Sequence, residues 1–136
     1  MVLRQSYIPF EIGYLLQAKK IWMFKMESLP IDQRRQKAID EFVRKATQIY
    51  GDRIRGITLF GSVARGKPST DSDTDLLVVI DKEDFRLRRE LIGLAFDVLM
   101  DTGGDISVRV LSSQDFQTRK SFSFLKNVLA EGIKVA

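Results

Sequence analysis

The sequence predicts an α/β (α+β) fold in which helices pack on a small mixed β-sheet. Segments with the apolar period of an amphipathic helix alternate with short apolar runs that are typical of strands. The chain of 136 residues is long enough for one domain with a hydrophobic core, and its 44% hydrophobic and 29% charged residues are ordinary for a globular protein. A single domain of alternating helices and strands is therefore expected.

The first half of this domain reads as a helix followed by two strands. The helix extends from about residue 32 to Tyr50 and stops at Gly51. Strands over residues 57–60 and 76–80 flank a turn, and so short a connection favours antiparallel pairing. The apolar face of the helix is formed by Ile39, Phe42, Val43, Ala46, Ile49 and Tyr50.

The second half adds a helix, a strand and a final helix. The strand over residues 105–111 alternates apolar and polar side chains, and it needs the helix over residues 84–100 as a crossover. The apolar stripe of that crossover helix is Leu87, Leu91, Leu94, Ala95 and Val98. The final helix is expected over residues 113–130. Its core-facing residues are expected to be Phe122, Leu125, Val128 and Leu129.

Residues 1–30 are expected to form an N-terminal extension, and residues 31–136 the domain itself. Ser28 before Pro30 is typical of a helix start, which favours a boundary there. The apolar run over residues 8–26 is interrupted by charged residues, which argues against a membrane span and a signal peptide. An extra helix there could cover the sheet, mediate dimerisation or bind a partner, with docking onto its own domain as the default.

Charge and cysteine content narrow the function classes. The net charge of +4 favours anionic ligands, although the basic residues are spread along the chain. Their clusters read as solvated helix faces, and no signature of a common RNA-binding module is present, so direct nucleic-acid binding is disfavoured. The absence of cysteine excludes disulfides and a catalytic thiol, and it is compatible with a cytoplasmic protein.

Asp73 and Asp75 are candidate ligands for a metal ion. Residues two apart in a strand point to the same face, so both carboxylates can reach one common ligand. Two carboxylates held so close repel each other unless a cation lies between them. Mg²⁺ is commonly held by one or two carboxylates together with substrate phosphates, whereas a chain without histidine or cysteine does not suit zinc. The pair therefore predicts a magnesium site.

The turn that begins with Gly61 and Ser62 is a candidate phosphate site. It follows an apolar strand and is expected to open a short helical turn. Glycine allows a phosphate to approach the backbone closely, and serine adds a hydroxyl and an N–H group. Arg65 and Lys67 stand nearby as possible further contacts. Strand, Gly-Ser turn, basic residue and D-x-D pair thus outline a metal and triphosphate site.

The segments GSVARG and SDTDLLV resemble the signature of the polymerase-beta-like nucleotidyltransferase superfamily, and their spacing resembles its minimal nucleotidyltransferases (MNT). The resemblance covers roughly residues 32 to 134, and the terminal FSFLKNVLAEGIKV shares it. It implies a nucleotidyltransferase fold and a third carboxylate on a neighbouring strand. We place this carboxylate at Asp105; Asp97 reads as a helix-surface charge, and Asp101 stands at a helix end. Arg109, on the same strand face as Asp105, could contact phosphate or pair with Asp105.

The resemblance also implies a reaction. Asp73, Asp75 and Asp105 would hold two Mg²⁺ ions, and Gly61 and Ser62 would bind the β- and γ-phosphates of ATP or another NTP. A nucleoside monophosphate would pass to an acceptor hydroxyl, with pyrophosphate as the leaving group. The short chain leaves no room for an acceptor-binding domain, so the acceptor would come from a partner or across a homo-oligomer interface.

Three functions fit these expectations. The favoured one is transfer of AMP, or another NMP, to a hydroxyl of a partner protein by the antitoxin of a HEPN/MNT toxin-antitoxin pair. The second is a binding antitoxin that neutralises its partner by forming a complex. The third is a small-molecule nucleotidyltransferase, against which the short chain argues. No residue is placed to identify the nucleobase.

Overall fold

The computed structural model describes residues 33–67 and 73–136, and the predicted N-terminal extension lies outside these ranges. The helices are α2 (Gln33–Tyr50), α3 (Gly61–Ala64), α4 (Phe85–Thr102), α5 (Ser113–Thr118) and α6 (Ser123–Glu131), with a 3-10 turn η2 (Gly51–Arg53). The strands are β1 (Ile54–Phe60), β2 (Thr74–Ile80), β3 (Ile106–Ser112) and β4 (Ile133–Lys134). The boundary predicted near residue 30 stays a prediction.

The strands form one mixed sheet in the order β3-β2-β1-β4. β1 pairs antiparallel with β2, and β2 pairs parallel with β3 through the α4 crossover, so the predicted mixed sheet is confirmed. β4 was not expected from the sequence. It is only two residues long, too short for a readable period, and pairs antiparallel with β1.

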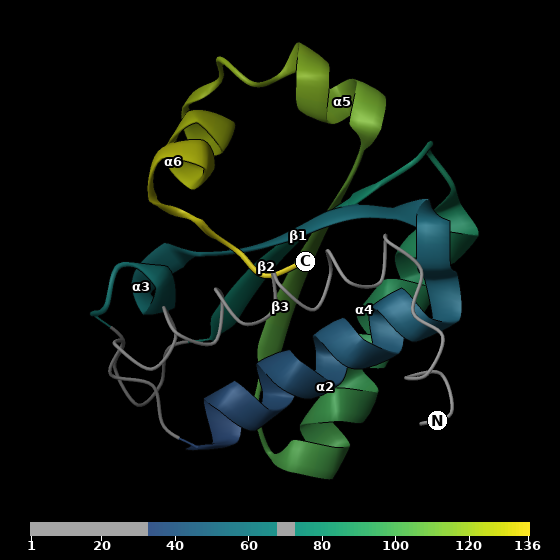
Figure 1. Ribbon diagram of the computed structural model, residues 1–136, viewed down its shortest axis with the longest axis vertical. Coiled ribbons are helices and arrows are strands. Elements are labelled where there is room, and N and C mark those ends of the chain that lie inside the picture. The colour runs from purple at the N-terminus through teal and green to yellow at the C-terminus, as the bar shows by residue number, and fades with distance from the viewer. Residues whose placement is uncertain (1–32, 68–72) are drawn as a thin grey trace, which may run out of the picture.

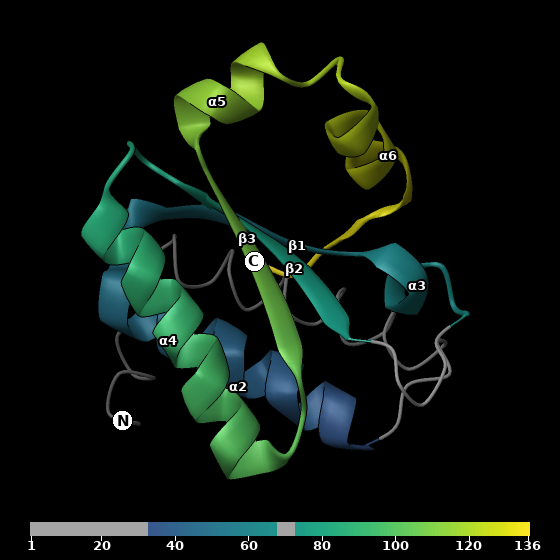
Figure 2. The same cartoon turned by 180° about the vertical axis from the view of Figure 1, so that it is seen from behind.

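Helices cover both faces of this sheet. Figures 1 and 2 show α2 and α4 on one face and α5 and α6 on the other. The larger core lies between the sheet and the α2/α4 layer and includes the whole stripe predicted for α4. A smaller cluster on the α5/α6 side is built on Leu77, Leu125 and Val128. Because side chains alternate along β2, Leu76 and Val78 face the larger core and Asp75 and Leu77 face the α5/α6 side.

The single final helix predicted over residues 113–130 is wrong, because the chain turns between α5 and α6. Phe122 has the extended backbone of a helix N-cap, and its N–H donates to the carbonyl of Arg119 at 3.0 Å. Leu125 and Val128 are buried as expected, whereas Phe122 and Leu129 are 61% and 54% exposed. The two short helices α5 and α6 bury fewer apolar side chains against the sheet than one long helix would. Ile49, near the end of α2, is also exposed.

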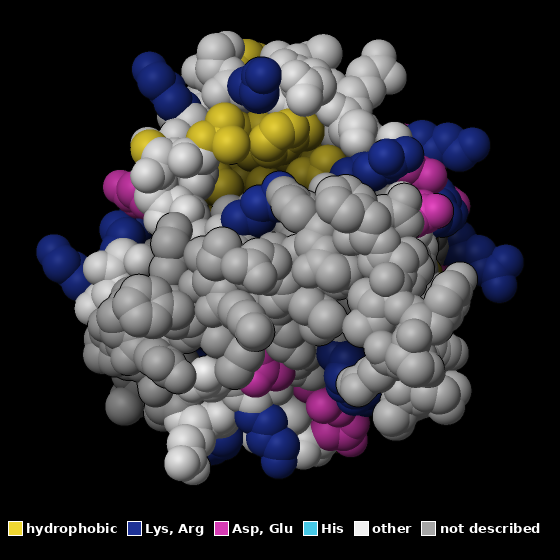
Figure 3. Space-filling model, in the orientation of Figure 1, with side chains coloured by type: hydrophobic (Ala, Val, Ile, Leu, Met, Phe, Trp, Pro, Cys, Tyr) yellow, Lys and Arg dark blue, Asp and Glu magenta, His cyan; other side chains and the backbone are white. Residues whose placement is uncertain are grey.

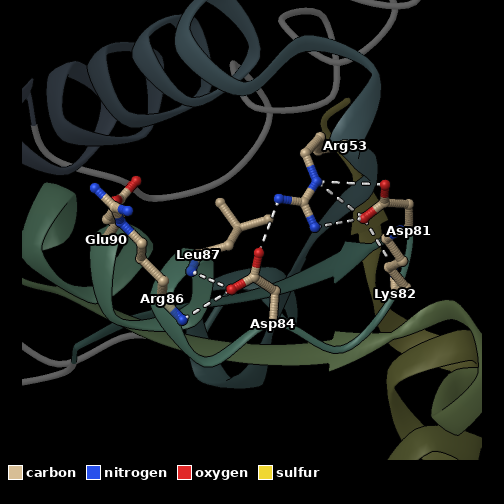
Figure 4. Close-up of polar contacts among 7 residues, drawn as sticks. All are labelled: Arg53, Asp81, Lys82, Asp84, Arg86, Leu87 and Glu90. Atoms are coloured by element: carbon tan, nitrogen blue, oxygen red, sulfur yellow. Dashed lines mark hydrogen bonds and ion pairs between the residues drawn. The ribbon is translucent and has the colours of Figure 1, made fainter.

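An ion-pair network fixes the start of α4 against the sheet (Figure 4). Arg53 donates to Asp81 at 3.1 Å and to Asp84 at 3.0 Å. Asp84 is also the N-cap of α4 and accepts hydrogen bonds from the N–H groups of Arg86 and Leu87. The bond from Arg53, followed by these backbone bonds, lowers the pKa of Asp84. The network joins the start of β1, the end of β2 and the crossover helix.

Within residues 33–67 and 73–136, no helix combines the length and the apolar character that crossing a membrane requires.

Candidate active site

Asp73 and Asp75 lie where β2 begins, on the side of the sheet that faces α5 and α6. Asp75 is the second residue of β2 and pairs in register with Phe60 of β1 and Ser107 of β3. Asp73 immediately precedes the strand and is exposed, whereas Asp75 is half-buried. Asp73 is nevertheless close enough for its charge to act on Asp75.

The surroundings of Asp75 disfavour its negative charge. Burial, followed by repulsion from Asp73, raises the pKa of Asp75, while the positive charges of Arg109 and Arg65 act in the opposite direction. A carboxylate of this kind gains stability when a proton or a cation binds to it. Arg65, the predicted phosphate contact, and Arg109, for which the sequence left two roles open, are thus both close enough to act electrostatically on the Asp75 carboxylate.

Asp105 lies beside Asp73 because their strands run parallel. Thr74 donates its N–H to the carbonyl of Asp105 at 3.1 Å, and Thr74 pairs in register with Ile106. Burial, the charge of Asp73 and a side-chain hydrogen bond with Asp73 raise the pKa of Asp105. Asp73 therefore interacts with both other carboxylates of the predicted set.

The two rival carboxylates lie elsewhere. Asp97 is exposed on α4, and Asp101, near the end of the same helix, forms an ion pair with Lys45 at 3.3 Å. The structure thus brings Asp105, and neither of the others, next to Asp73. The catalytic role of Asp105 stays a prediction.

The donor set suits a hard divalent cation. Asp73 and Asp75 offer carboxylate oxygens, which Mg²⁺ prefers, and the raised pKa of Asp75 reflects a site where added positive charge is favourable. In the described parts of the chain, no group of three or more acidic side chains is arranged to hold a metal ion. The chemistry of the Asp73 and Asp75 pair fits Mg²⁺ completed by substrate phosphates. The magnesium site and its second ion stay predictions.

Gly61 lies against the carboxylate of Asp75. It is the first residue of α3 and has a φ of +79°, a conformation that residues with a side chain rarely adopt. A Cβ placed there would overlap Asp75 Oδ2 and lie 3.3 Å from Asp75 Cγ. Ser62 follows and is half-buried, and its carbonyl accepts a hydrogen bond from the N–H of Lys67 at 2.9 Å. The predicted phosphate turn and the predicted metal ligand are therefore in direct contact.

Two aromatic residues that the sequence did not indicate, Phe60 and Phe124, lie beside the arginines that it did indicate. The guanidinium of Arg109 stacks over the ring of Phe124, 5.1 Å from its centroid. Phe124 also meets Phe60 edge to face at 5.3 Å between centroids. Arg65, on the other side, forms an exposed ion pair with Glu131 of α6 at 3.5 Å. No local signal in the sequence connects these residues, since they come from β1, the end of α3, β3 and α6, which only the fold brings together.

Comparison with known proteins identifies the family of the chain. Residues 37–136 match the family described as "Polymerase beta, Nucleotidyltransferase". The chain is 41% identical over 97 residues to "Putative protein adenylyltransferase MJ0604" of Methanocaldococcus jannaschii, an alignment that covers 71% of this chain and 93% of that protein.

Two solved structures are also similar. One is described as a toxin-antitoxin with AMP-PNP; it is 23% identical, covers 70% of each chain and has a TM-score of 0.47. The other is described as a tri-AMPylated Shewanella oneidensis HEPN toxin in complex with MNT antitoxin; it is 20% identical, covers 76% of this chain and 72% of that chain, and has a TM-score of 0.44. The family match and the 41% identical relative establish the membership: the chain belongs to the polymerase beta nucleotidyltransferase family.

Proposed function

We propose that this protein transfers AMP from ATP to a hydroxyl group of a partner protein. The observation that carries the proposal is the contact of Gly61 with Asp75, together with the interaction of Asp73 with both Asp75 and Asp105. A phosphate-binding turn and carboxylates thus meet at one end of the sheet. The name of the 41% identical relative, a protein adenylyltransferase, supports both AMP as the transferred group and protein as the acceptor.

The turn at Gly61 and Ser62 would bind the β- and γ-phosphates of the nucleotide. Gly61 has no side chain, so the triphosphate can approach the backbone beside Asp75. Arg65 follows in the same turn, and its partner Glu131 is an exposed carboxylate that a phosphate can replace. Binding there directs the α-phosphate toward Asp73 and Asp75.

Asp73 and Asp75 would hold Mg²⁺, and Asp105 would complete a second ion site. Bound magnesium would neutralise charge on the phosphates and on the attacking and leaving oxygens. The acceptor oxygen attacks the α-phosphorus, the bond from that phosphorus to the β-phosphate oxygen breaks, and pyrophosphate leaves. The hydroxyl proton goes to Asp105 or to water.

The partner would be a HEPN-type toxin, as the sequence resemblance implies, and AMP transfer would make this chain the antitoxin of a cytoplasmic pair. The candidate site lies on the sheet at the starts of β2 and β3, and the proposal assigns the acceptor to a second protein. In this proposal, the partner brings its acceptor hydroxyl to the carboxylates.

The test is transfer of label from α-³²P-ATP to a partner protein encoded beside this chain and purified with it. Wild type with magnesium is expected to label the partner, and the double variant Asp73→Asn with Asp75→Asn is expected to lose about a hundredfold or more of the rate. Asp97→Asn, which removes an exposed carboxylate of α4, is the matched control and should label normally. Full transfer by the double variant would refute the assignment. Stable partner binding without transfer in wild type would instead indicate neutralisation by complex formation.

A further inference from the structure

A pocket opens beside the candidate active site, along the outer strand of the sheet. It has a volume of about 400 Å³ and lies where β3 meets α4 and the turn between α5 and α6. Its walls include Leu77 and Leu111 of the sheet and Leu125 of α6, with the exposed Phe122 at its margin. Figure 3, seen from the side on which β1 lies in front of β3, shows hydrophobic side chains gathered in a hollow beneath α5 and α6, with basic side chains around it.

The charged residues that line this pocket are all arginines. Arg88, Arg109 and Arg119 belong to the lining, and no acidic residue does. Glu83 neutralises Arg88 through a bond of 2.6 Å. Arg119 forms no ion pair with any residue in the described ranges, and Arg109 rests on the ring of Phe124. The pocket therefore has an apolar lining together with a net positive charge from its arginines.

The pocket lies on the acceptor side of the carboxylates, a conclusion that rests on the proposed function. Gly61 follows β1 and Asp105 precedes β3, with Asp75 on the central strand between them. An in-line displacement places the acceptor oxygen and the leaving pyrophosphate on opposite sides of the α-phosphorus. If the phosphates bind on the β1 side, the acceptor approaches from the β3 side. The pocket is located there, and Arg109 links it electrostatically to Asp75.

We propose that this pocket docks the acceptor protein by binding a segment that combines a large apolar side chain with flanking carboxylates. An apolar anchor in a pocket with charged residues at the rim is the arrangement that supplies both affinity and orientation at protein interfaces. The anchor would lie on Leu77, Leu111 and Leu125, and its carboxylates would pair with Arg119 and Arg109. The acceptor hydroxyl would then be held near Asp105.

Side-chain anchoring fits this pocket better than two other binding modes. Arg88 donates to the carbonyl of Val110, so part of the outer edge of β3 is already paired and less available for an added strand. Single-stranded RNA relies on aromatic stacking, whereas most apolar residues of the lining are aliphatic. An acidic and apolar protein segment is therefore the favoured occupant.

The first experiment measures binding without nucleotide or partner. The full isotope-labelled chain is titrated, by methyl NMR, with the acetylated peptide amides Glu-Phe-Leu-Glu and Lys-Phe-Leu-Lys and with a short oligoadenylate. The acidic peptide is expected to shift the methyl resonances of Leu77, Leu111 and Leu125 and to leave Leu91, in the opposite core, unchanged. Equal shifts with the basic peptide, no shifts at millimolar concentration, or stronger shifts with the oligoadenylate would each overturn the proposal.

Two matched pairs of variants sharpen the result. Arg119→Glu is expected to weaken binding of the acidic peptide about fivefold or more, whereas Lys120→Glu, which reverses a neighbouring exposed charge outside the lining, should not. Phe122→Ala removes an exposed residue of the pocket wall, and Phe85→Ala removes a phenylalanine that is also exposed but lies outside the lining. Both phenylalanines are largely exposed, so folding should survive in each. Equal effects within either pair would contradict the docking assignment.

The transfer reaction separates this proposal from the proposed function. With the co-purified partner, Arg119→Glu should raise KM for the partner about fivefold and leave kcat and KM for ATP unchanged. Unchanged KM for the partner with normal transfer would reject the docking pocket and keep the enzyme. Peptide binding at the pocket without any transfer by wild type would reject the enzyme and keep the pocket.

Discussion

Gly61 and Asp75 are in contact across two neighbouring strands, and the contact leaves no space for a side chain on Gly61. Gly61 has a positive φ at the point where β1 turns into α3, and Asp75 pairs with the residue just before it. One backbone conformation therefore positions the phosphate turn and the carboxylate together. This relationship makes the glycine a sensitive probe of the site.

Gly61→Ala is expected to reduce transfer more than it reduces stability. The positive φ costs about 1–2 kcal/mol for a residue with a Cβ, whereas displacement of the Asp75 carboxylate is expected to slow transfer about a hundredfold. Gly93→Ala is the control, because Gly93 lies in α4 with open space around it. That change should stabilise the helix by up to about 1 kcal/mol and leave transfer unchanged. Urea unfolding and labelled-ATP transfer measure the two effects, and normal transfer by Gly61→Ala would refute the contact.

Asp75→Asn is expected to raise stability while it abolishes activity. Burial and the neighbouring Asp73 disfavour the ionised form of Asp75, and asparagine removes that charge without a large change in shape. The melting temperature without magnesium should therefore rise at neutral pH. Added magnesium should stabilise wild type more than the variant, by about 1.4 kcal/mol at ten times its dissociation constant. A lower melting temperature of the variant in metal-free buffer would contradict this account.

The advantage of Asp75→Asn should disappear in acid. Because the pKa of Asp75 is raised in the folded state, protonation stabilises wild type. That stabilisation is fully present below the pKa of the unfolded chain and is lost as the pH rises through the higher folded pKa. Wild type and variant should thus differ at neutral pH and converge as the pH falls through this window. Urea unfolding at a series of pH values measures the difference, and a constant gap would show that ionisation of Asp75 is not its cause.

Gly104→Ala is expected to destabilise the protein by about 1–3 kcal/mol through overpacking. A Cβ on this buried glycine would lie 2.5 Å from the Cβ of Ala38 and 2.8 Å from the carbonyl oxygen of Arg34, both on α2. The clash would push the segment that carries Asp105 away from α2. Gly56→Ala is the control, since its nearest neighbour would be at the ordinary distance of 3.9 Å. Thermal unfolding measures the stability of both variants. Equal stability of the two would show that α2 can shift to accommodate the added methyl group without loss of stability.

Asp84→Ala is expected to lower the melting temperature more than Asp84→Asn. Both changes remove the charge that pairs with Arg53, but asparagine still accepts the hydrogen bonds that cap α4. The pKa of Asp84 is lowered in the folded state, so its stabilisation is present above the unfolded pKa and is lost as the pH falls through the folded one. The difference between wild type and Asp84→Asn should therefore shrink in acid. Equal melting temperatures of Asp84→Ala and Asp84→Asn would exclude the capping role.

Much of the fold could be predicted because the spacing of apolar residues along each segment agrees with the side chains that the structure buries. The α4 stripe from Leu87 to Val98 is buried as its period indicates, and the short turn at Gly61 does join antiparallel strands. The segment after Ser112 could not be predicted, because its apolar residues fit one long helix. Phe122 instead ends up exposed beside a turn. Whether Phe122 is buried depends on where the chain turns between α5 and α6, which local periodicity does not determine.

The sequence by itself determined the chemical identity of the site: two carboxylates on one strand face, a Gly-Ser turn before them, and no histidine or cysteine to offer another chemistry. Only the tertiary structure decided that Asp105 lies beside Asp73, that Gly61 contacts Asp75, and that arginines from a helix, a strand and a turn surround one apolar pocket. The physical reason is the distance along the chain over which each kind of signal acts. Periodicity and turn chemistry act over a few residues, whereas parallel pairing through a crossover helix brings together residues that are distant in the chain.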